Sequence, residues 1–354
     1  MSQGIRAFFA TDWTIDLGSS QITIGNSRRP EPWREPALAA RPDVPQGRSR
    51  AAKRATLWTG EAARTALREQ GGLQAVRPIR HGRVQHPEAL DLLLEGMLRR
   101  ARGAAGWTRW FPSVTGMLVP PGLSQEDRMR SRDLALRQGL GHVRLIDMAL
   151  APAHGCGLAL NQPGGQMVVD IGGGKVCLAA LSMGGVVAWH WSETGGLSLD
   201  EALAAYVERR YQVRISLFEA ERVKVEFGSV YPQDRPRAME VYGVQTRSGL
   251  YQKVTLDDSE VRDVLSDACE PLVQALHQGF KAVPPELASD ILRAGVVLTG
   301  GGALLPGLTD FLSERTGLTY RVAQDPINAT LRGAQSLLWL GWRSAESDSA
   351  ASRA

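Results

Sequence analysis

With 354 residues, of which 43% are hydrophobic, the chain is long enough to bury one or two substantial cores, and no run of about eighteen apolar residues predicts a membrane span. The net charge of +4 is mild, and the excess arginine lies around residues 28 to 54 and 99 to 109 without a nucleic-acid-binding motif, which disfavours nucleic acid and suits a solvated surface or an anionic lipid layer. Three widely separated cysteines indicate a reduced, cytoplasmic compartment and argue against a disulfide framework or a metal site.

The first predicted element is a short strand that ends in an acidic turn. In Thr14-Ile-Asp-Leu-Gly-Ser-Ser-Gln-Ile-Thr-Ile24, Asp16 and Gly18 follow the strand, small hydroxyl residues come next, and a second strand begins. Residues 26 to 56 are rich in Arg, Pro and Ala and alternate poorly between polar and apolar residues. We therefore expect part of that region to be a loose loop.

An aromatic segment follows an amphipathic helix predicted at Leu90–Arg102. The segment Trp107-Thr-Arg-Trp-Phe-Pro112 is unusual for a solvent-exposed connection because large aromatic side chains are costly to expose in a group. Aromatic residues beside a proline also often cap a core. Further along, Val143–Gly155 predicts a strand that feeds a helix.

The middle of the chain holds a second acidic turn, in Met167-Val-Val-Asp-Ile-Gly-Gly-Gly-Lys-Val176. A buried strand ends at Asp170, and the glycines after it allow backbone N–H groups to approach an anion. Asp170 stands where a hydrated cation could be held. Taken alone, the pattern fits an ordinary strand-ending turn equally well.

A third turn of this kind lies near the end of the chain. Gly295–Leu308 predicts a buried strand that opens into three glycines and then a helix. Between the second and third turns, Ser198 and Glu201 predict a capping box at the start of a helix, and Tyr242–Thr255 predicts a hairpin. Two acidic turns in separate halves, with a distal glycine turn, predict two similar α/β lobes clasping a nucleotide.

These turns, in this order, resemble those of the actin, sugar-kinase and heat-shock-chaperone superfamily. The rest of the chain, from Met1 to about Leu340, is similar to the MreB family of bacterial actins, most specifically in Glu221–Ser229, Pro284–Asp290 and Val297–Leu305. The resemblance implies an α/β, actin-like two-lobed fold with two duplicated α/β domains. It assigns lobe I to residues 1–27, 70–150 and 322–354 (large subdomain) and 28–69 (small subdomain), and lobe II to residues 151–188 and 256–321 (large subdomain) and 189–255 (small subdomain).

The resemblance also implies a cofactor, ATP or GTP with Mg²⁺. Asp16 and Asp170 would hold the metal through water. For Glu221 and Lys224, which lie on one helical face, an ordinary surface ion pair is the alternative to contact with the adenosine. The nucleotide-contacting residues carried over from the family are Asp16, Gly18, Ser19, Ser20, Gln21, Asp170, Gly172, Gly173, Gly174, Lys175, Glu221, Lys224, Gly300, Gly301, Gly302 and Ala303.

The chain departs from the family where the attacking water is positioned. Family members carry a glutamate at the position of Met148, and a thioether can neither accept a proton nor polarise water. Asp147 is the remaining catalytic candidate, but neighbouring residues on a strand point to opposite faces. Lys175 and Val176 replace two threonines, and Lys175 either adds a cation near the phosphates or projects to solvent. The enzyme is therefore at most a slow ATPase.

Two segments match positions where family members contact the membrane. The first contains Ile5, Phe8 and Phe9 and lacks the long apolar core of a secretory signal; its alternative is a frayed terminus that packs on the domain. The second contains Trp107, Trp110 and Phe111, residue types suited to a bilayer interface.

The leading hypothesis is a cytoplasmic protein, peripheral on the inner face of the cell membrane, that binds nucleotide and assembles head-to-tail into filaments organising cell-wall synthesis and rod shape. Its expected partners are copies of itself, another MreB, inner-membrane morphogenesis proteins and the anionic membrane surface, with no nucleic acid. A non-filamentous nucleotide-binding scaffold or regulator of a conventional MreB is the alternative. A small-molecule kinase on the same fold is disfavoured because no substrate motif is apparent.

Overall fold

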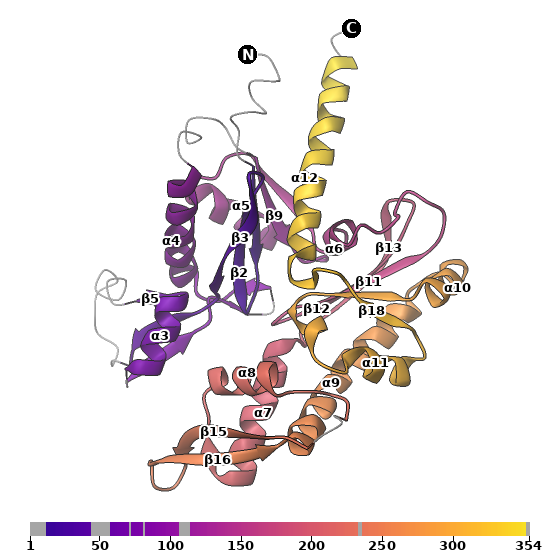
Figure 1. Ribbon diagram of the computed structural model, residues 1–354. Coiled ribbons are helices and arrows are strands. Elements are labelled where there is room, and N and C mark those ends of the chain that lie inside the picture. Colours follow the sequence, from indigo (N-terminus) through magenta and orange to yellow (C-terminus); the bar gives the residue numbers. More distant parts are fainter. Residues whose placement is uncertain are drawn as a thin grey trace. The chain divides into compact units, whose positions relative to one another are not determined.

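The computed structural model in Figure 1 describes residues 12–43, 57–70, 72–80, 82–105, 114–232 and 236–351. The chain divides into two compact units, one made of Met1–Gly155 with Thr330–Ala354 and the other of Cys156–Ala329. Each unit is built around its own five-stranded sheet. In the part of the chain described, no helix is long and apolar enough to cross a membrane.

The sheet of the first unit has the order β10-β9-β1-β2-β3. Its central strand β1 (Trp13–Leu17) pairs antiparallel with β2 (Gln21–Asn26), which pairs antiparallel with the edge strand β3 (Arg29–Pro36). On its other side β1 lies parallel to β9 (Thr115–Val119), and β9 lies parallel to β10 (Val143–Asp147). Strand β1 therefore belongs both to the antiparallel hairpin with β2 and to the parallel half of the sheet with β9 and β10.

The sheet of the second unit has the order β13-β12-β11-β17-β18. Its central strand β11 (Gln166–Ile171) pairs antiparallel with β12 (Val176–Ser182), and β12 pairs antiparallel with β13 (Gly185–Ser192). On the other side β17 (Val296–Thr299) and β18 (Tyr320–Val322) continue the sheet in parallel. In both sheets the central strand has two successive antiparallel strands on one side and two parallel strands on the other. This repetition confirms the predicted duplicated α/β architecture.

The sheet of the first unit is covered on both faces. Residues of β1 and β2 pack with Leu90, Leu94 and Met97 of α4 (Pro87–Ala105), while Leu118 and Ile146 pack with Leu338 of α12 (Pro326–Ala351). Alternation along the strands separates these two cores. The other elements form small sheets and short helices: β4 (Ala39–Pro42), β5 (Trp58–Thr59), α3 (Glu61–Glu69), β6 (Leu73–Val76), β7 (Ile79–Arg80), β8 (Arg83–Val84), α4 (Pro87–Ala105), α5 (Gln125–Arg137), α6 (Ala151–Gly155) and α12 (Pro326–Ala351).

Strand β3 lies in the region where part of the chain was expected to form a loose loop. Within residues 26 to 56, β3 and β4 are regular strands, and residues 44 to 56 lie outside the described part, so the loop itself stays a prediction. Prolines hide the strand pattern of β3, and they are tolerated because β3 is an edge strand. Its Trp33 ring packs against Trp13, with ring centroids 6.1 Å apart.

The remaining elements of the second unit form a helical layer and a three-stranded sheet. The hairpin predicted at Tyr242–Thr255 is confirmed as β15 and β16. The predicted capping box at Ser198 is wrong, because helix α7 begins at Gly196 and its N-cap residue, Gly195, makes no side-chain cap. The elements are α7 (Gly196–Tyr211), β14 (Val213–Arg214), α8 (Leu217–Glu226), β15 (Ala238–Gln245), β16 (Tyr251–Asp257), α9 (Asp258–Lys281), α10 (Pro285–Ala294), the 3₁₀ turn η2 (Gly301–Leu304) and α11 (Leu308–Thr316).

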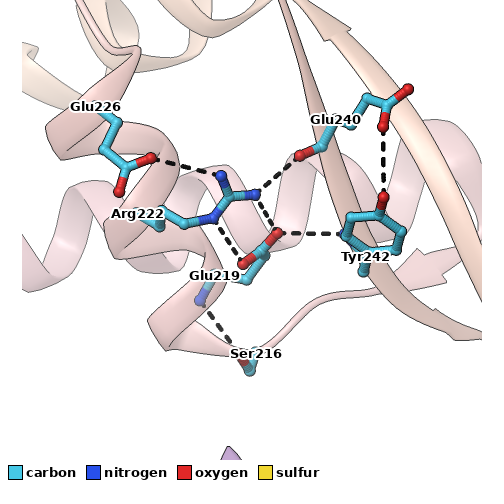
Figure 2. A network of polar contacts seen from close by, with 6 residues as sticks. All are labelled: Ser216, Glu219, Arg222, Glu226, Glu240 and Tyr242. Atoms are coloured by element: carbon cyan, nitrogen blue, oxygen red, sulfur yellow. Dashed lines mark hydrogen bonds and ion pairs between the residues drawn. The ribbon is translucent and has the colours of Figure 1, made fainter.

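Side chains of α8 close part of one edge of the three-stranded sheet. Strand β14 pairs only with the last residues of β15, so no described strand pairs with the earlier residues of β15 on that side. Figure 2 shows what replaces it: Glu219 accepts a hydrogen bond from the Tyr242 backbone N–H at 3.3 Å, and Arg222 donates to the Glu240 carbonyl at 2.8 Å. Arg222 also holds the Glu219 carboxylate at 2.6 Å, so the two side chains act as one unit.

Candidate functional site

Asp170 lies next to the end of the central strand of the second unit. It is 7% exposed, and its Oδ1 accepts a hydrogen bond from the Thr299 hydroxyl at 3.2 Å. Thr299 ends β17, the parallel neighbour of β11, so both residues lie at the carboxyl edge of the sheet. Ligand sites of open α/β sheets gather at this edge.

The turn after Asp170 is fixed by the start of helix α7. The Gly172 N–H donates to the Lys175 carbonyl at 2.9 Å, while the carbonyls of Gly172 and Gly173 accept hydrogen bonds from Gly196 at 3.0 Å and Leu197 at 2.7 Å. A Cβ atom at Gly195 would lie 2.6 Å from the Gly172 oxygen, so this approach requires glycine. The first amides of α7 therefore hold the β11–β12 hairpin.

The residues after the glycines are buried. Lys175 is 8% exposed, which contradicts the alternative that it projects to solvent. Val176 and Cys177 are buried too, and none of these three residues carries a hydroxyl group. Cys177 lies opposite Asp170 in the register of β11 and β12.

Two of the three glycines at the end of β17 are needed for packing. Gly300 has a φ of +80°, and a Cβ atom there would lie 2.6 Å from Asp170 Oδ1 and still closer to the Ile171 carbonyl oxygen. A Cβ atom at Gly302 would collide with the Ile171 side chain, whereas one at Gly301 would have no atom within 4 Å. Ala303 is buried in the core. Of these residues, only Gly301 is exposed and sterically open.

Lys224 of helix α8 has a buried partner. Its Nζ lies 2.6 Å from Oδ1 of Asp200 on α7 and donates to the Gly196 carbonyl at 2.9 Å. The Lys224 side chain is 16% exposed, so the alternative of an ordinary surface ion pair is wrong for this residue. Glu221 is half-buried one helical turn earlier.

Asp200 was not among the site residues predicted from the sequence. It lies on the buried stripe of α7, together with Gly196, Leu203 and Val207. A carboxylate at a core position needs a charged or hydrogen-bonding partner, because an unpaired buried charge is costly. That rule was the signal that could have pointed to Asp200.

The first unit carries a hairpin of the same kind. Asp16 is the penultimate residue of β1, and Gly18 lies so close to the Gln21 carbonyl oxygen that no Cβ atom fits there. Ser19 is 3% exposed, and its hydroxyl has no hydrogen-bond partner among the residues that the structure describes. Ser20 accepts a backbone hydrogen bond from Ala37 at 2.8 Å. The predicted contact residue Gln21 is exposed.

Comparison with known proteins identifies the family. The sequence model described as MreB/Mbl protein matches residues 10–340. The chain belongs to the MreB/Mbl family. It is 35% identical over 338 residues to the cell shape-determining protein MreB of Escherichia coli (strain K12), with 96% of each chain covered. It is 31% identical over 333 residues to the cell shape-determining protein Mbl of Bacillus subtilis (strain 168), covering 93% of this chain and 96% of that protein.

The fold agrees with this membership. The crystal structure of MreB5 of Spiroplasma citri bound to ADP matches with a TM-score of 0.85 and 25% identity, covering 95% of this chain and 98% of that chain. The same protein bound to AMPPNP matches equally well, with a TM-score of 0.85. The chain therefore has the actin-like fold that the sequence predicted.

Met148, where the resemblance implies a glutamate, is 3% exposed and packs in an apolar cluster with Leu118, Ala151 and Leu331. The neighbouring Asp147 ends β10, and its Oδ1 accepts a hydrogen bond from the Ala149 N–H at 2.8 Å. The Asp147 carboxylate is thus engaged in a local turn.

The described part of the chain holds no cluster of metal-binding side chains, and two of its cysteines are protonated. No group of three or more His, Cys, Asp or Glu residues there could hold a metal ion. Burial raises the pKa of Cys156 to about 11 and that of Cys269 to about 12, so both remain thiols at neutral pH. The predicted membrane residues Ile5, Phe8, Phe9, Trp107, Trp110 and Phe111 lie outside the described residues.

Proposed function

We propose that the chain is an actin-like cell shape-determining protein that binds ATP, or GTP, through its two acidic hairpins. The observation that carries this proposal is the repetition of the hairpin: Asp16 in β1 and Asp170 in β11 are each the penultimate residue of the central strand of a five-stranded sheet. In each unit an antiparallel hairpin follows, with a glycine turn. Family relatives are cell shape-determining proteins, and MreB5 of Spiroplasma citri has been crystallised with ADP and with AMPPNP.

The residues fit a nucleotide with a hydrated Mg²⁺. The buried Ser19 hydroxyl has no acceptor or donor among the described residues, and a phosphate oxygen would satisfy it. Mg²⁺ keeps several waters and typically takes one or two carboxylates together with phosphate oxygens, which suits isolated aspartates. When bound, the metal would neutralise phosphate charge, and Asp16 and Asp170 are the residues that would orient its waters.

The same reasoning supports slow hydrolysis. An enzyme of this kind accelerates hydrolysis mainly by positioning water and stabilising charge. The buried apolar surroundings of Met148 offer no proton acceptor, and the Asp147 carboxylate is held by the Ala149 amide. Lys175 and Val176 supply no hydroxyl. Nucleotide binding is therefore retained while turnover is weak.

Family membership supports a proposal about assembly and location. We propose head-to-tail filaments, alone or together with another MreB, on the inner face of the cell membrane. Anionic lipid and inner-membrane morphogenesis proteins are the proposed partners. The proposed membrane contacts are Ile5, Phe8, Phe9, Trp107, Trp110 and Phe111. Filaments there would organise cell-wall synthesis and rod shape.

Sedimentation tests the proposal. The purified chain is centrifuged with and without MgATP or MgGTP, in the presence and absence of anionic liposomes. Nucleotide-dependent pelleting that increases with lipid is expected, and Asp170→Asn should abolish it. Asp290→Asn is the matched control, because Asp290 contacts Gly165 at the opposite end of β11. A chain that binds nucleotide but stays in the supernatant under every condition would favour the scaffold alternative instead.

A further inference from the structure

A buried ion pair joins two helices of the second unit beside the phosphate hairpin. The Asp200 side chain is 2% exposed and that of Lys224 is 16% exposed, with 2.6 Å between Oδ1 and Nζ. Buried pairs of this kind add little to stability compared with apolar residues of similar volume, since desolvation costs about as much as the attraction returns. A specific geometric role is therefore the better reason for its presence.

The Lys224 ammonium is not saturated by these contacts. An ammonium group has three N–H donors. The ammonium forms an ion pair with Asp200 at 2.6 Å, and one N–H donates to the Gly196 carbonyl at 2.9 Å. No other described residue accepts a hydrogen bond from Lys224, so donor capacity of this fixed cation remains for an acceptor on a ligand.

The same contacts lead from α8 to the β11–β12 hairpin. The Gly196 carbonyl accepts from Lys224, while the Gly196 N–H donates to the Gly172 carbonyl at 3.0 Å. Leu197 donates to the Gly173 carbonyl at 2.7 Å. A single residue, Gly196, therefore connects the cation on α8 with the glycine turn after Asp170.

We infer that Asp200 is a positioning residue for nucleotide binding: it fixes the Lys224 ammonium toward the nucleoside and, through Gly196, couples the nucleoside contact to the phosphate hairpin. The inference rests on the proposed function, because it needs a nucleotide whose nucleoside contacts α8 and whose phosphates contact the hairpin.

The physical reason lies in preorganisation. A free lysine side chain has many rotamers, and ordering it on binding costs free energy. Asp200 already orders the Lys224 side chain in the ligand-free protein, so binding does not have to order it. An asparagine at 200 would keep the shape but lose the charge, and the ammonium would then move toward solvent.

Isothermal titration calorimetry with two probes tests the inference. MgATP reports nucleoside and phosphate contacts together, and Mg-tripolyphosphate reports the phosphate contacts alone. Asp200→Asn is expected to weaken MgATP binding roughly tenfold, about the value of one charge-assisted hydrogen bond, and to leave tripolyphosphate affinity within about twofold. In a Lys224→Met background, Asp200→Asn should cause no further loss. Asp290→Asn, which removes another aspartate at 2.6 Å from its arginine, is the control and should bind like the parent.

The outcomes separate the inference from the proposed function. If the parent protein binds no MgATP or MgGTP, the proposed function fails. If the parent binds and Asp200→Asn binds MgATP equally well, or loses both probes equally, the inference is overturned. A second measurement needs no variant: saturating adenosine should slow amide hydrogen exchange at Gly196 and Leu197, although adenosine has no phosphate to contact the hairpin. Unchanged exchange with adenosine bound would also overturn the coupling.

Discussion

Replacing Gly300 by alanine tests whether the glycine turn after β17 holds Asp170 in place. The Gly300 backbone has φ +80° and ψ 169°, a region that residues with a Cβ atom rarely enter, and this conformation costs roughly 2 kcal/mol for alanine. The added methyl would also overlap the Ile171 carbonyl oxygen and lie 2.6 Å from Asp170 Oδ1. Relieving that overlap costs ~2 kcal/mol more, as in other overpacked sites.

The expected loss of unfolding free energy is thus about 4 kcal/mol, which most domains survive. Urea unfolding followed by far-UV circular dichroism measures it. Because the relief requires β11 or Asp170 to move, MgATP affinity should fall as well, measured by calorimetry on the folded fraction.

The neighbouring glycine supplies the control. Gly301 is exposed and lies in η2, and no atom comes within 4 Å of the position that an alanine Cβ would occupy there. Gly301→Ala should therefore change stability by less than about 0.5 kcal/mol. If Gly300→Ala and Gly301→Ala are equally stable and bind MgATP equally, the steric account of this turn is wrong.

Three further predictions concern named contacts. Met148→Glu with Lys175→Thr should raise phosphate release from MgATP; a double variant that binds MgATP but releases phosphate no faster than the parent would contradict the account of the water site. Arg222→Met should lower the unfolding free energy by about 2 kcal/mol because it removes the cation beside the part-buried Glu219 carboxylate and the donor to the Glu240 carbonyl. Glu226→Gln, which removes the longer 3.5 Å contact of the same arginine, should cost under ~0.5 kcal/mol, and equal losses in chemical denaturation would refute this. Burial would raise the pKa of Glu260, but hydrogen bonds from Tyr206 and Tyr211 outweigh burial and lower it. The stabilisation that these hydrogen bonds give the folded state is therefore present above pH ~4.5 and is lost as the pH falls through the folded-state pKa. Tyr211→Phe should destabilise the protein at pH 7 and much less in acid, which thermal melts across pH would show.

The sequence predicted the architecture because the turns that define it are local. A strand, an acidic residue and glycines occur within a few positions of one another, and their repetition indicates two similar units. The hairpin of β15 and β16 was found for the same reason. Strand β3 was missed because its prolines break the alternation, which an edge strand tolerates.

The contacts within the candidate site depend on residues far apart in the chain, and the sequence did not predict them. Asp200 pairs with Lys224, and the hairpin carbonyls of Gly172 and Gly173 are held by the first amides of α7. The start of α7 was placed wrongly at Ser198 because its first amides are satisfied by the hairpin and need no side-chain cap. Only packing reveals such partners.

The Glu219–Arg222 pair in Figure 2 also limits how this small sheet can associate with other chains. An unpaired strand edge is a template on which a foreign strand can add. By occupying the Tyr242 N–H and the Glu240 carbonyl, the two side chains remove that template from β15 without adding a strand. Misassembly by strand addition is therefore blocked there by a single ion pair, and the protection should be lost together with Arg222.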